Sequence, residues 1–489
     1  MVMRRVDQTT PEDRDLLDWA SVIGQRLNVD VLTEVVVGSR LAVMKRMYAL
    51  KQRYGLLDAD QTGFHFAHAK VREVLYEELP PTLRRECHLA VGEALERQFA
   101  EQPGPVAYDL ARHFVAAGDR RRGFRYAVIA ADKAEKALAL SEAAEHLSAA
   151  LSFLSPGDDL GGGGHLEMEL QHRVGRLLSM LGRLEEADAA FQVALQIGQG
   201  RGDRQMQSTI LLALSSMHGR GGDWEGAIRL GDQSLALAEA VGYHEGRADA
   251  LLSTGFFAFE QGNWHGAISR LKDALAIATE HNKLVQRARI LGNMAIMYNA
   301  RGRPEQAIDL YRESIDTFDR LNQPLDVARG LSNLGFSYYS LKQCDKALTC
   351  YRDALERLGK IGDVRERGLL YLHVAEASLT QGDLVTAREN CTLAARRFAR
   401  LGFDLGIADV DRVYAGVAMR EGRWQVAERY VREALSVYEE HGDQLNIAET
   451  HEELSRLLAE RGNAAQAEEE LSRSRLVLER LFETSTSKA

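Results

Sequence analysis

Two pairs of polar side chains recur at an interval of 40 residues in the middle of the sequence. Asn293 and Asn333 form one pair, and Arg289 and Arg329 form the other. An amide both donates and accepts hydrogen bonds, so paired asparagines suit the peptide backbone of a ligand. A guanidinium group can hold a carboxylate through two parallel hydrogen bonds. The aromatic residues that could supply anchor pockets beside them are Phe256, Phe259, Phe336 and Tyr339.

A second interpretation of these residues stays open at the level of sequence. The asparagines could hydrogen-bond neighbouring helices, and the aromatic rings could belong to the core. Phe336 directly follows the small residue Gly335, so its ring could face either the core or the ligand. Three tryptophans also recur at one phase of the pattern, and we expect them to pack neighbouring helices together. They are Trp224, Trp264 and Trp424.

No catalytic or metal-binding motif accompanies these candidates. Gly359-Lys360 lacks the upstream glycine and the following hydroxyl residue of a phosphate-binding loop. His65 and His68 have no cysteine or acidic ligand close by in the sequence, and the four cysteines show no CxxC spacing. We therefore expect no enzymatic activity, no cofactor and no bound metal.

Length and charge limit the classes of function. The chain has 489 residues, of which 45% are hydrophobic and 27% charged, as in folded proteins larger than one compact core. Its formal charge of −10 argues against nucleic acid as the main partner, because phosphate contacts need a basic face. The sequence has no run of 18 apolar residues and no apolar stretch near its start. We therefore expect a cytoplasmic protein without a membrane partner.

An internal repeat of 40 residues dominates the sequence. A glycine recurs at this interval, Lys342 takes its place in one unit, and an alanine follows five residues later in all eight units. A glycine at a fixed point between two helical patterns predicts a turn with positive φ. The predicted turn glycines are Gly182, Gly222, Gly262, Gly302, Gly382, Gly422 and Gly462.

Small residues at two further positions predict closely packed pairs of helices. The side chain seven residues before the turn position is always Gly, Ala or Ser, and so is the side chain twelve residues after it. Small side chains let two helix axes approach closely, so each unit is predicted to be a helical hairpin stacked on the next. Gly or Asn also recurs twenty residues after the turn, as a left-handed helix C-cap requires. The residues at that position are Gly202, Gly242, Asn282, Asn322, Gly362, Gly402 and Gly442.

This pattern resembles the tetratricopeptide repeat (TPR). The resemblance covers residues 166–482, as eight units of the 40-residue variety. It implies an all-α fold, a right-handed α-solenoid of helix–turn–helix units. It also implies that the first helix of each hairpin lines a concave groove. The asparagines, arginines and aromatic residues described above would then face a ligand in that groove.

The residues before the repeats are predicted to fold differently. Three amphipathic helical patterns and a short β-hairpin, with its turn at Thr62-Gly63, fill residues 11–80 and are typical of a winged-helix domain. Residues 81–160 are predicted to be a helical connector with degenerate repeat-like hairpins. Residues 161–165 are predicted to be a glycine-rich joint, and residues 483–489 a polar tail.

One stretch of the N-terminal region is similar to a segment of signal-transduction ATPases of the STAND type. In that family an NTPase domain is followed by a winged helix and then by tetratricopeptide repeats, and the last two parts follow in that order here. The phosphate-binding loop is absent, so ATP binding is not implied. The resemblance suggests the sensor half of such a protein, with a separate ATPase or signalling domain as a partner. The residues that carry it are Phe64, Phe66, His68, Arg72, Leu75, Tyr76, Arg84, Arg85 and His88.

The third helix of the winged-helix pattern is basic, which raises the question of DNA. Five Lys and Arg side chains there could contact phosphates. In the resembling ATPases this module braces neighbouring domains instead, and we expect the same role here. The basic residues are Arg40, Lys45, Arg46, Lys51 and Arg53.

Two functional hypotheses follow from the sequence. The first is a non-enzymatic scaffold or adaptor that binds a peptide or partner domain in the concave groove, in bacterial-type signal transduction or regulation. The second is the small-molecule effector-sensing arm of a STAND-type ATPase or transcription regulator. An open groove lined by several repeats would favour the first, and a closed pocket with a few convergent polar groups the second.

Overall fold

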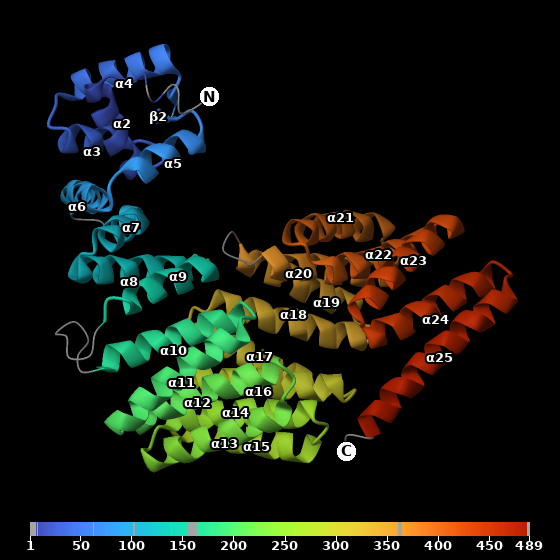
Figure 1. The fold of residues 1–489 in the computed structure, drawn as a ribbon. Coiled ribbons are helices and arrows are strands. Elements are labelled where there is room, and N and C mark those ends of the chain that lie inside the picture. Colours follow the sequence, from blue (N-terminus) through green and yellow to red (C-terminus); the bar gives the residue numbers. More distant parts are fainter. Residues whose placement is uncertain are drawn as a thin grey trace. The chain divides into compact units, whose positions relative to one another are not determined.

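The computed structural model describes residues 6, 8–61, 63–100, 103–137, 139–154, 164–359 and 364–486 of the chain. These residues are mostly helical and contain one small sheet of two strands (Figure 1). They divide into two compact units, Met1–Gly242 and Tyr243–Ala489. The predicted joint falls largely on residues 161–163, which lie outside the described residues, as do Gly362 and residues 487–489.

The first unit begins with three short helices whose starts are set by capping side chains. The side-chain oxygens of Thr10, Asn28 and Ser39 accept hydrogen bonds from backbone N–H groups in the first turns, which would otherwise lack partners. Gly55, with φ 59°, ends the third helix in the left-handed conformation that favours glycine. The helices are α2 (Pro11–Ile23), α3 (Val29–Val35) and α4 (Arg40–Tyr54).

A β-hairpin and a further helix complete the N-terminal fold. Strand β1 (Leu57–Asp60) pairs antiparallel with β2 (Gly63–Phe66), with Leu57 opposite Phe66. Both of these side chains are buried, so the hairpin closes over the helices. Helix α5 (Ala69–Glu78) follows, and the predicted order of three helices, hairpin and helix is confirmed. Thr62 of the predicted turn lies outside the described residues.

A buried chain of hydrogen bonds joins α5 to the connector helices. Tyr76 Oη lies 2.9 Å from His88 Nε2, His88 Nδ1 lies 2.9 Å from His113 Nδ1, and His113 Nε2 lies 2.9 Å from Arg112 Nη2. A guanidinium can only donate, so His113 accepts at Nε2 and donates from Nδ1 to His88. The connector helices are α6 (Pro81–Gln98), η1 (Gly104–Val106), α7 (Ala107–Ala117), α8 (Arg120–Lys136) and α9 (Leu140–Leu151).

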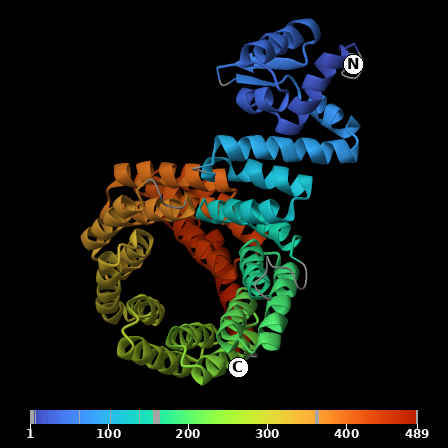
Figure 2. The same cartoon turned by 90° about the vertical axis from the view of Figure 1, so that its left-hand side faces the viewer.

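Helical hairpins fill the rest of both units. The first unit holds α10 (His165–Met180), α11 (Leu184–Arg201), α12 (Arg204–Arg220) and α13 (Trp224–Ala240). Figure 2 shows the hairpins of the second unit, coloured from yellow-green to red, following one another along a curve. They comprise α14 (His244–Glu260), α15 (Trp264–Glu280), α16 (Leu284–Ala300), α17 (Pro304–Arg320), α18 (Pro324–Ser340), α19 (Cys344–Leu358), α20 (Val364–Gln381), α21 (Leu384–Leu401), α22 (Asp404–Arg420), α23 (Trp424–His441), α24 (Gln444–Glu460) and α25 (Ala464–Thr486).

The turn inside each hairpin has a left-handed residue where the sequence repeats glycine. The seven glycines at this position have φ between 67° and 85°, and Lys342 has φ 61° in the unit that lacks one. Asn282 and Asn322, at the end of the second helix, have φ 53° and 55°. The 40-residue spacing therefore reflects a backbone requirement that recurs in each hairpin.

The small residues of the repeat lie where the two helices of a hairpin touch. A Cβ atom added at Gly335 would lie 2.4 Å from the ring of Tyr351 on the next helix. Where serine occupies this position, its hydroxyl donates to a backbone carbonyl across the same interface, as Ser215 does to Ala227 (2.6 Å). These contacts explain why the position admits only Gly, Ala and Ser.

Candidate functional site

The first helices of the hairpins form the inner face of the second unit. Neighbouring first helices contact one another directly, α14 with α16, α16 with α18, α18 with α20, and α20 with α22. In a stack that bends, the helices on the inner side are the ones that approach each other. The first helices therefore line the concave side, as the resemblance to the tetratricopeptide repeat implied.

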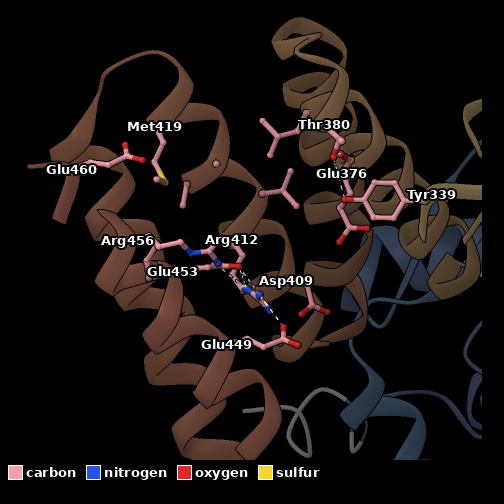
Figure 3. A pocket seen from close by; sticks show the side chains of 15 residues that line it. Tyr339, Glu376, Thr380, Asp409, Arg412, Met419, Glu449, Glu453, Arg456 and Glu460 are labelled. Atoms are coloured by element: carbon pink, nitrogen blue, oxygen red, sulfur yellow. Dashed lines mark hydrogen bonds and ion pairs between the residues drawn. The ribbon is translucent and has the colours of Figure 1, made fainter. Parts of the chain in front are cut away.

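A cavity of about 480 Å³ opens on this face near the C-terminal end of the array (Figure 3). Side chains from the first helices of four successive hairpins, α18, α20, α22 and α24, supply nearly all of its lining. Apolar side chains such as Leu379 and Met419 line part of the wall. The polar lining residues are Tyr339, Glu376, Thr380, Asp409, Arg412, Glu449, Glu453, Arg456 and Glu460.

Arg412 organises one wall of this cavity. Its Nη2 lies 2.6 Å from Glu453 Oε1 and 3.1 Å from Glu449 Oε2, and its Nη1 donates to Asn446 Oδ1 at 3.0 Å. Burial opposes the charge of Arg412, but the hydrogen bonds to Glu453 outweigh it and raise the pKa of the guanidinium. The network fixes three α24 side chains against α22.

Two further carboxyl groups of the lining, Glu376 on α20 and Asp409 on α22, are only partly compensated. The pKa of Glu376 is raised to about 7, because burial and the nearby carboxylates of Asp409 and Glu453 raise it more than Arg412 lowers it. Burial also raises the pKa of Asp409, although Tyr438 Oη donates a 2.6 Å hydrogen bond to its Oδ1. Figure 3 shows Glu376 and Asp409 projecting from different helices into the same space.

The predicted aromatic residues are distributed between this cavity and the surface beside it. Tyr339 lines the cavity, and its Oη lies 3.1 Å from Thr380 Oγ1 on the next hairpin. Phe336, one turn earlier on α18, is 48% exposed, so its ring faces away from the core. Phe256 and Phe259 lie on α14, which does not contribute to the lining, and both are half-buried. The ring of Phe259 packs edge-on against Trp264.

The predicted arginines contact carboxylates of neighbouring hairpins. Arg289 Nη1 lies 3.4 Å from Asp249 Oδ1, and Arg329 Nη2 lies 2.6 Å from Glu366 Oε1. Both guanidinium groups remain more than half exposed. These ion pairs are the intrachain alternative to binding a ligand carboxylate, and an exposed pair of this kind contributes little to stability.

The two predicted asparagines have different surroundings. Asn293 Nδ2 donates to the Arg289 carbonyl on its own helix at 2.9 Å. Asn333 and Arg329 line a smaller cavity of about 270 Å³ between α18 and α20. His373 lines it too, with a pKa lowered to about 4 by burial and no hydrogen-bond partner at Nδ1 among the described residues.

Of the sequence candidates, Tyr339 lines the large cavity and Arg329 and Asn333 line the smaller one, and charged residues of the large cavity repeat the candidates' phases further along the chain. Glu376 stands one repeat after Phe336, and Asp409 stands three repeats after Arg289. Glu453 stands three repeats after Asn333. The charged residues at these phases could therefore have been found by extending the 40-residue register to the C-terminal repeats. The sequence candidates are asparagine, arginine and aromatic residues, and they do not include Glu376, Asp409, Arg412, Glu449 or Glu453.

The other sequence candidates have ordinary structural surroundings. On α4, Arg40, Arg46 and Lys51 pair with Asp30, Asp13 and Asp58 at 2.7, 2.9 and 2.5 Å, so three of its basic side chains are used within the fold. Within the described ranges, no group of three or more His, Cys, Asp and Glu side chains could hold a metal. None of the helices that the structure describes is long and apolar enough to cross a membrane.

Comparison with known proteins agrees with the repeat assignment. Residues 206–280, 246–320 and 286–360 each match the family model described as Tetratricopeptide repeat. Repeats of this kind generally form non-catalytic scaffolds for protein interactions. No curated protein sequence matches the chain.

Solved structures share the fold at low identity. The apo form of RapI is 14% identical with a TM-score of 0.53, covering 78% of this chain and 98% of RapI. A Rap protein complexed with competence and sporulation factor is 12% identical with a TM-score of 0.50, covering 74% of this chain and 98% of that one. A STAND protein with a tetratricopeptide repeat sensor from Pyrococcus horikoshii is 14% identical over 99% of this chain, with a TM-score of 0.47. The chain spans 65% of the length of that STAND protein.

Proposed function

Because this chain is built on tetratricopeptide repeats, we propose that it is an adaptor that binds an extended segment of a partner protein along the inner face of α18–α24. It acts by binding rather than by chemistry, in a signalling or regulatory pathway. One observation carries the proposal: a single cavity is lined by the first helices of four successive hairpins. A segment lying across four hairpins must be extended.

The side chains of this face suit a peptide. The Arg412 network holds Glu449 and Glu453 in fixed positions, so little conformational entropy would be lost when a ligand contacts them. The exposed ring of Phe336 lies one repeat before Glu376 on the same face and would supply an aromatic anchor. The Rap protein of similar fold was solved with competence and sporulation factor bound, which supports a binding role for this fold in general.

A second candidate function is the sensing of a small effector molecule. Its specific support is the cavity volume of about 480 Å³, which lies within the range of about 300–1,000 Å³ common for small-ligand pockets. Several polar groups also converge there. We rank it second because the lining comes from the first helices of four hairpins.

Blocking the cavity tests the proposal. Thr380→Trp would place an indole at the rim, whereas Thr349→Trp places one on the second helix α19. Both hydroxyls donate to the carbonyl four residues earlier, so both variants lose that local hydrogen bond, and Thr380→Trp also loses the contact with Tyr339 Oη. Immobilised wild type and Thr349→Trp are expected to retain the same partner from source-cell extract, and Thr380→Trp is expected to lose it. Equal retention by all three proteins would contradict binding at this face.

A further inference from the structure

The lining of the large cavity carries an excess of negative charge. It holds the five carboxyl groups of Glu376, Asp409, Glu449, Glu453 and Glu460 but only the two guanidinium groups of Arg412 and Arg456, which corresponds to a net charge of −3 when all are ionised. The chain as a whole is also acidic, but these carboxyl groups converge on one enclosed space. A ligand of opposite charge would be favoured there.

Hydrogen bonds within the wall leave specific acceptors unused. Glu449 and Glu453 are engaged by Arg412, and Tyr339 and Thr380 face each other. Among the residues that the structure describes, Asp409 accepts a side-chain hydrogen bond from Tyr438 alone, through Oδ1. The Glu376 carboxyl group, which protein encloses except on the cavity side, has no hydrogen-bond or ion-pair partner among the described residues. A half-buried carboxylate without a partner is costly, so Glu376 offers an unused acceptor to a ligand in the cavity.

We infer that this cavity receives a protonated amine or guanidinium group, the side chain of a lysine or arginine of the bound partner, between Glu376 and Asp409. This rests on the proposed function and names the chemistry of its ligand. Leu379, Val413 and Met419 supply apolar wall for the methylene stem of such a side chain. An organic cation fits better than a metal ion, because the described residues contain no group of three or more His, Cys, Asp and Glu side chains that could hold a metal.

Three capped tripeptides test the inference directly. In each, alanine flanks one central residue, which is lysine, arginine or norleucine; norleucine keeps the lysine stem but lacks its ammonium group. Free butylamine is the fourth probe. The readout is the methyl resonance of Met419 in protein carrying ¹³C-methyl methionine, assigned with Met419→Leu. We expect the lysine and arginine peptides to shift this resonance at concentrations roughly tenfold or more below the norleucine peptide, as loss of a charge-assisted hydrogen bond implies.

Two isosteric variants locate the acceptor. Glu376→Gln and Asp409→Asn are each expected to weaken binding of the lysine peptide by roughly tenfold and to leave binding of the norleucine peptide unchanged. Glu389→Gln, which removes an exposed carboxylate from α21 outside the cavity, is the matched control and should bind as wild type does. A lysine peptide that binds Glu376→Gln and Asp409→Asn as tightly as wild type would overturn the inference.

The remaining outcomes separate this inference from the proposed function. Equal shifts by the lysine and norleucine peptides would overturn the inference that the cavity binds a cation. If Thr380→Trp still loses the partner and Thr349→Trp does not, the proposed binding of a partner at this face would stand. A shift by butylamine and by neither charged peptide would overturn the peptide source and indicate a free amine. No shift by any probe, together with partner capture by Thr380→Trp, would overturn both proposals.

Discussion

The guanidinium group of Arg412 on α22 lies 2.6 Å, Nη2 to Oε1, from the carboxylate of Glu453 on α24. This ion pair joins two successive hairpins at the wall of the cavity, and both side chains are largely buried. Its position links the stability of the C-terminal repeats to the geometry of the proposed binding face.

Arg412→Met is expected to destabilise the second unit by about 3 kcal/mol. The substitution leaves Glu453 and Glu449 without their cation in a partly buried place, and the loss of one partner of such a pair is costly. The measurement is hydrogen exchange of α22 and α24 at neutral pH. Arg432→Met, which removes an exposed i,i+4 pair with Glu428 on α23, should cost less than about 0.5 kcal/mol. Equal effects of the two substitutions would contradict this assignment.

Gly335→Ala is expected to destabilise the protein by about 1–3 kcal/mol. The new Cβ would lie 2.4 Å from the buried ring of Tyr351, so one helix must move. Gly292→Ala is the matched control, since its Cβ would meet only Ser314 at an ordinary 3.5 Å. We expect Gly292→Ala to be neutral or stabilising by about 0.5–1 kcal/mol through helix propensity. Thermal unfolding of the two variants measures the difference, and a Gly292→Ala variant as unstable as Gly335→Ala would contradict this account.

Lys342→Gly is expected to stabilise the second unit by about 1 kcal/mol. Lys342 has φ 61°, a left-handed conformation that costs a residue with a Cβ about 1–2 kcal/mol and costs glycine little. Part of this stabilisation is offset, because glycine has a larger conformational entropy in the unfolded chain than lysine has. Lys342→Ala keeps the strain and should not stabilise. A midpoint of unfolding that is unchanged in Lys342→Gly would contradict the reading of this turn.

Much of the fold could be predicted because each hairpin must satisfy the same backbone and packing conditions. A turn with positive φ selects glycine, and contact with Tyr351 or its equivalents selects small residues such as Gly335. Lys342 departs from the pattern at the sequence level and still adopts the same φ. Packing of the neighbouring helices therefore overrides the local preference there.

The candidate site was less predictable, because surface residues are not required to be the same in every repeat, unlike the turn and packing residues. The register gives the phase of a groove residue but not the repeat in which a cavity forms. Glu376 and Phe336 share one phase, yet one is enclosed and the other is 48% exposed. That difference depends on the side chains of α22 and α24 that close over Glu376, and only the assembled structure brings these together.

Acidification is expected to lower the stability of the connector helices α6 and α7 against unfolding. Burial lowers the pKa of His88 to about 4 and of His113 to about 2, below the ordinary value of 6.5. The unfolded chain then binds more protons below pH 6.5, so the free energy of unfolding falls as pH drops from 6.5 toward 4. Each histidine contributes a slope approaching about 1.4 kcal/mol per pH unit.

Hydrogen exchange of α6 and α7 at pH 7.5 and 5.5, corrected for the intrinsic rates, measures this loss. The double variant His88→Phe/His113→Leu is the control, because it cannot be protonated at either position. It should show a clearly smaller change between the two pH values. An equal change in the variant would assign the pH dependence to other groups.

The most direct test of the central claim is photo-cross-linking in the source cells. Benzoylphenylalanine is placed at Thr380, on the rim of the cavity, or at Thr349, on the second helix α19. The account predicts that light yields a covalent adduct with a partner protein from position 380 and not from position 349, identified by mass and peptide sequence. Adducts from position 349 alone, or equal adducts from both positions, would contradict binding on the inner face of α18–α24.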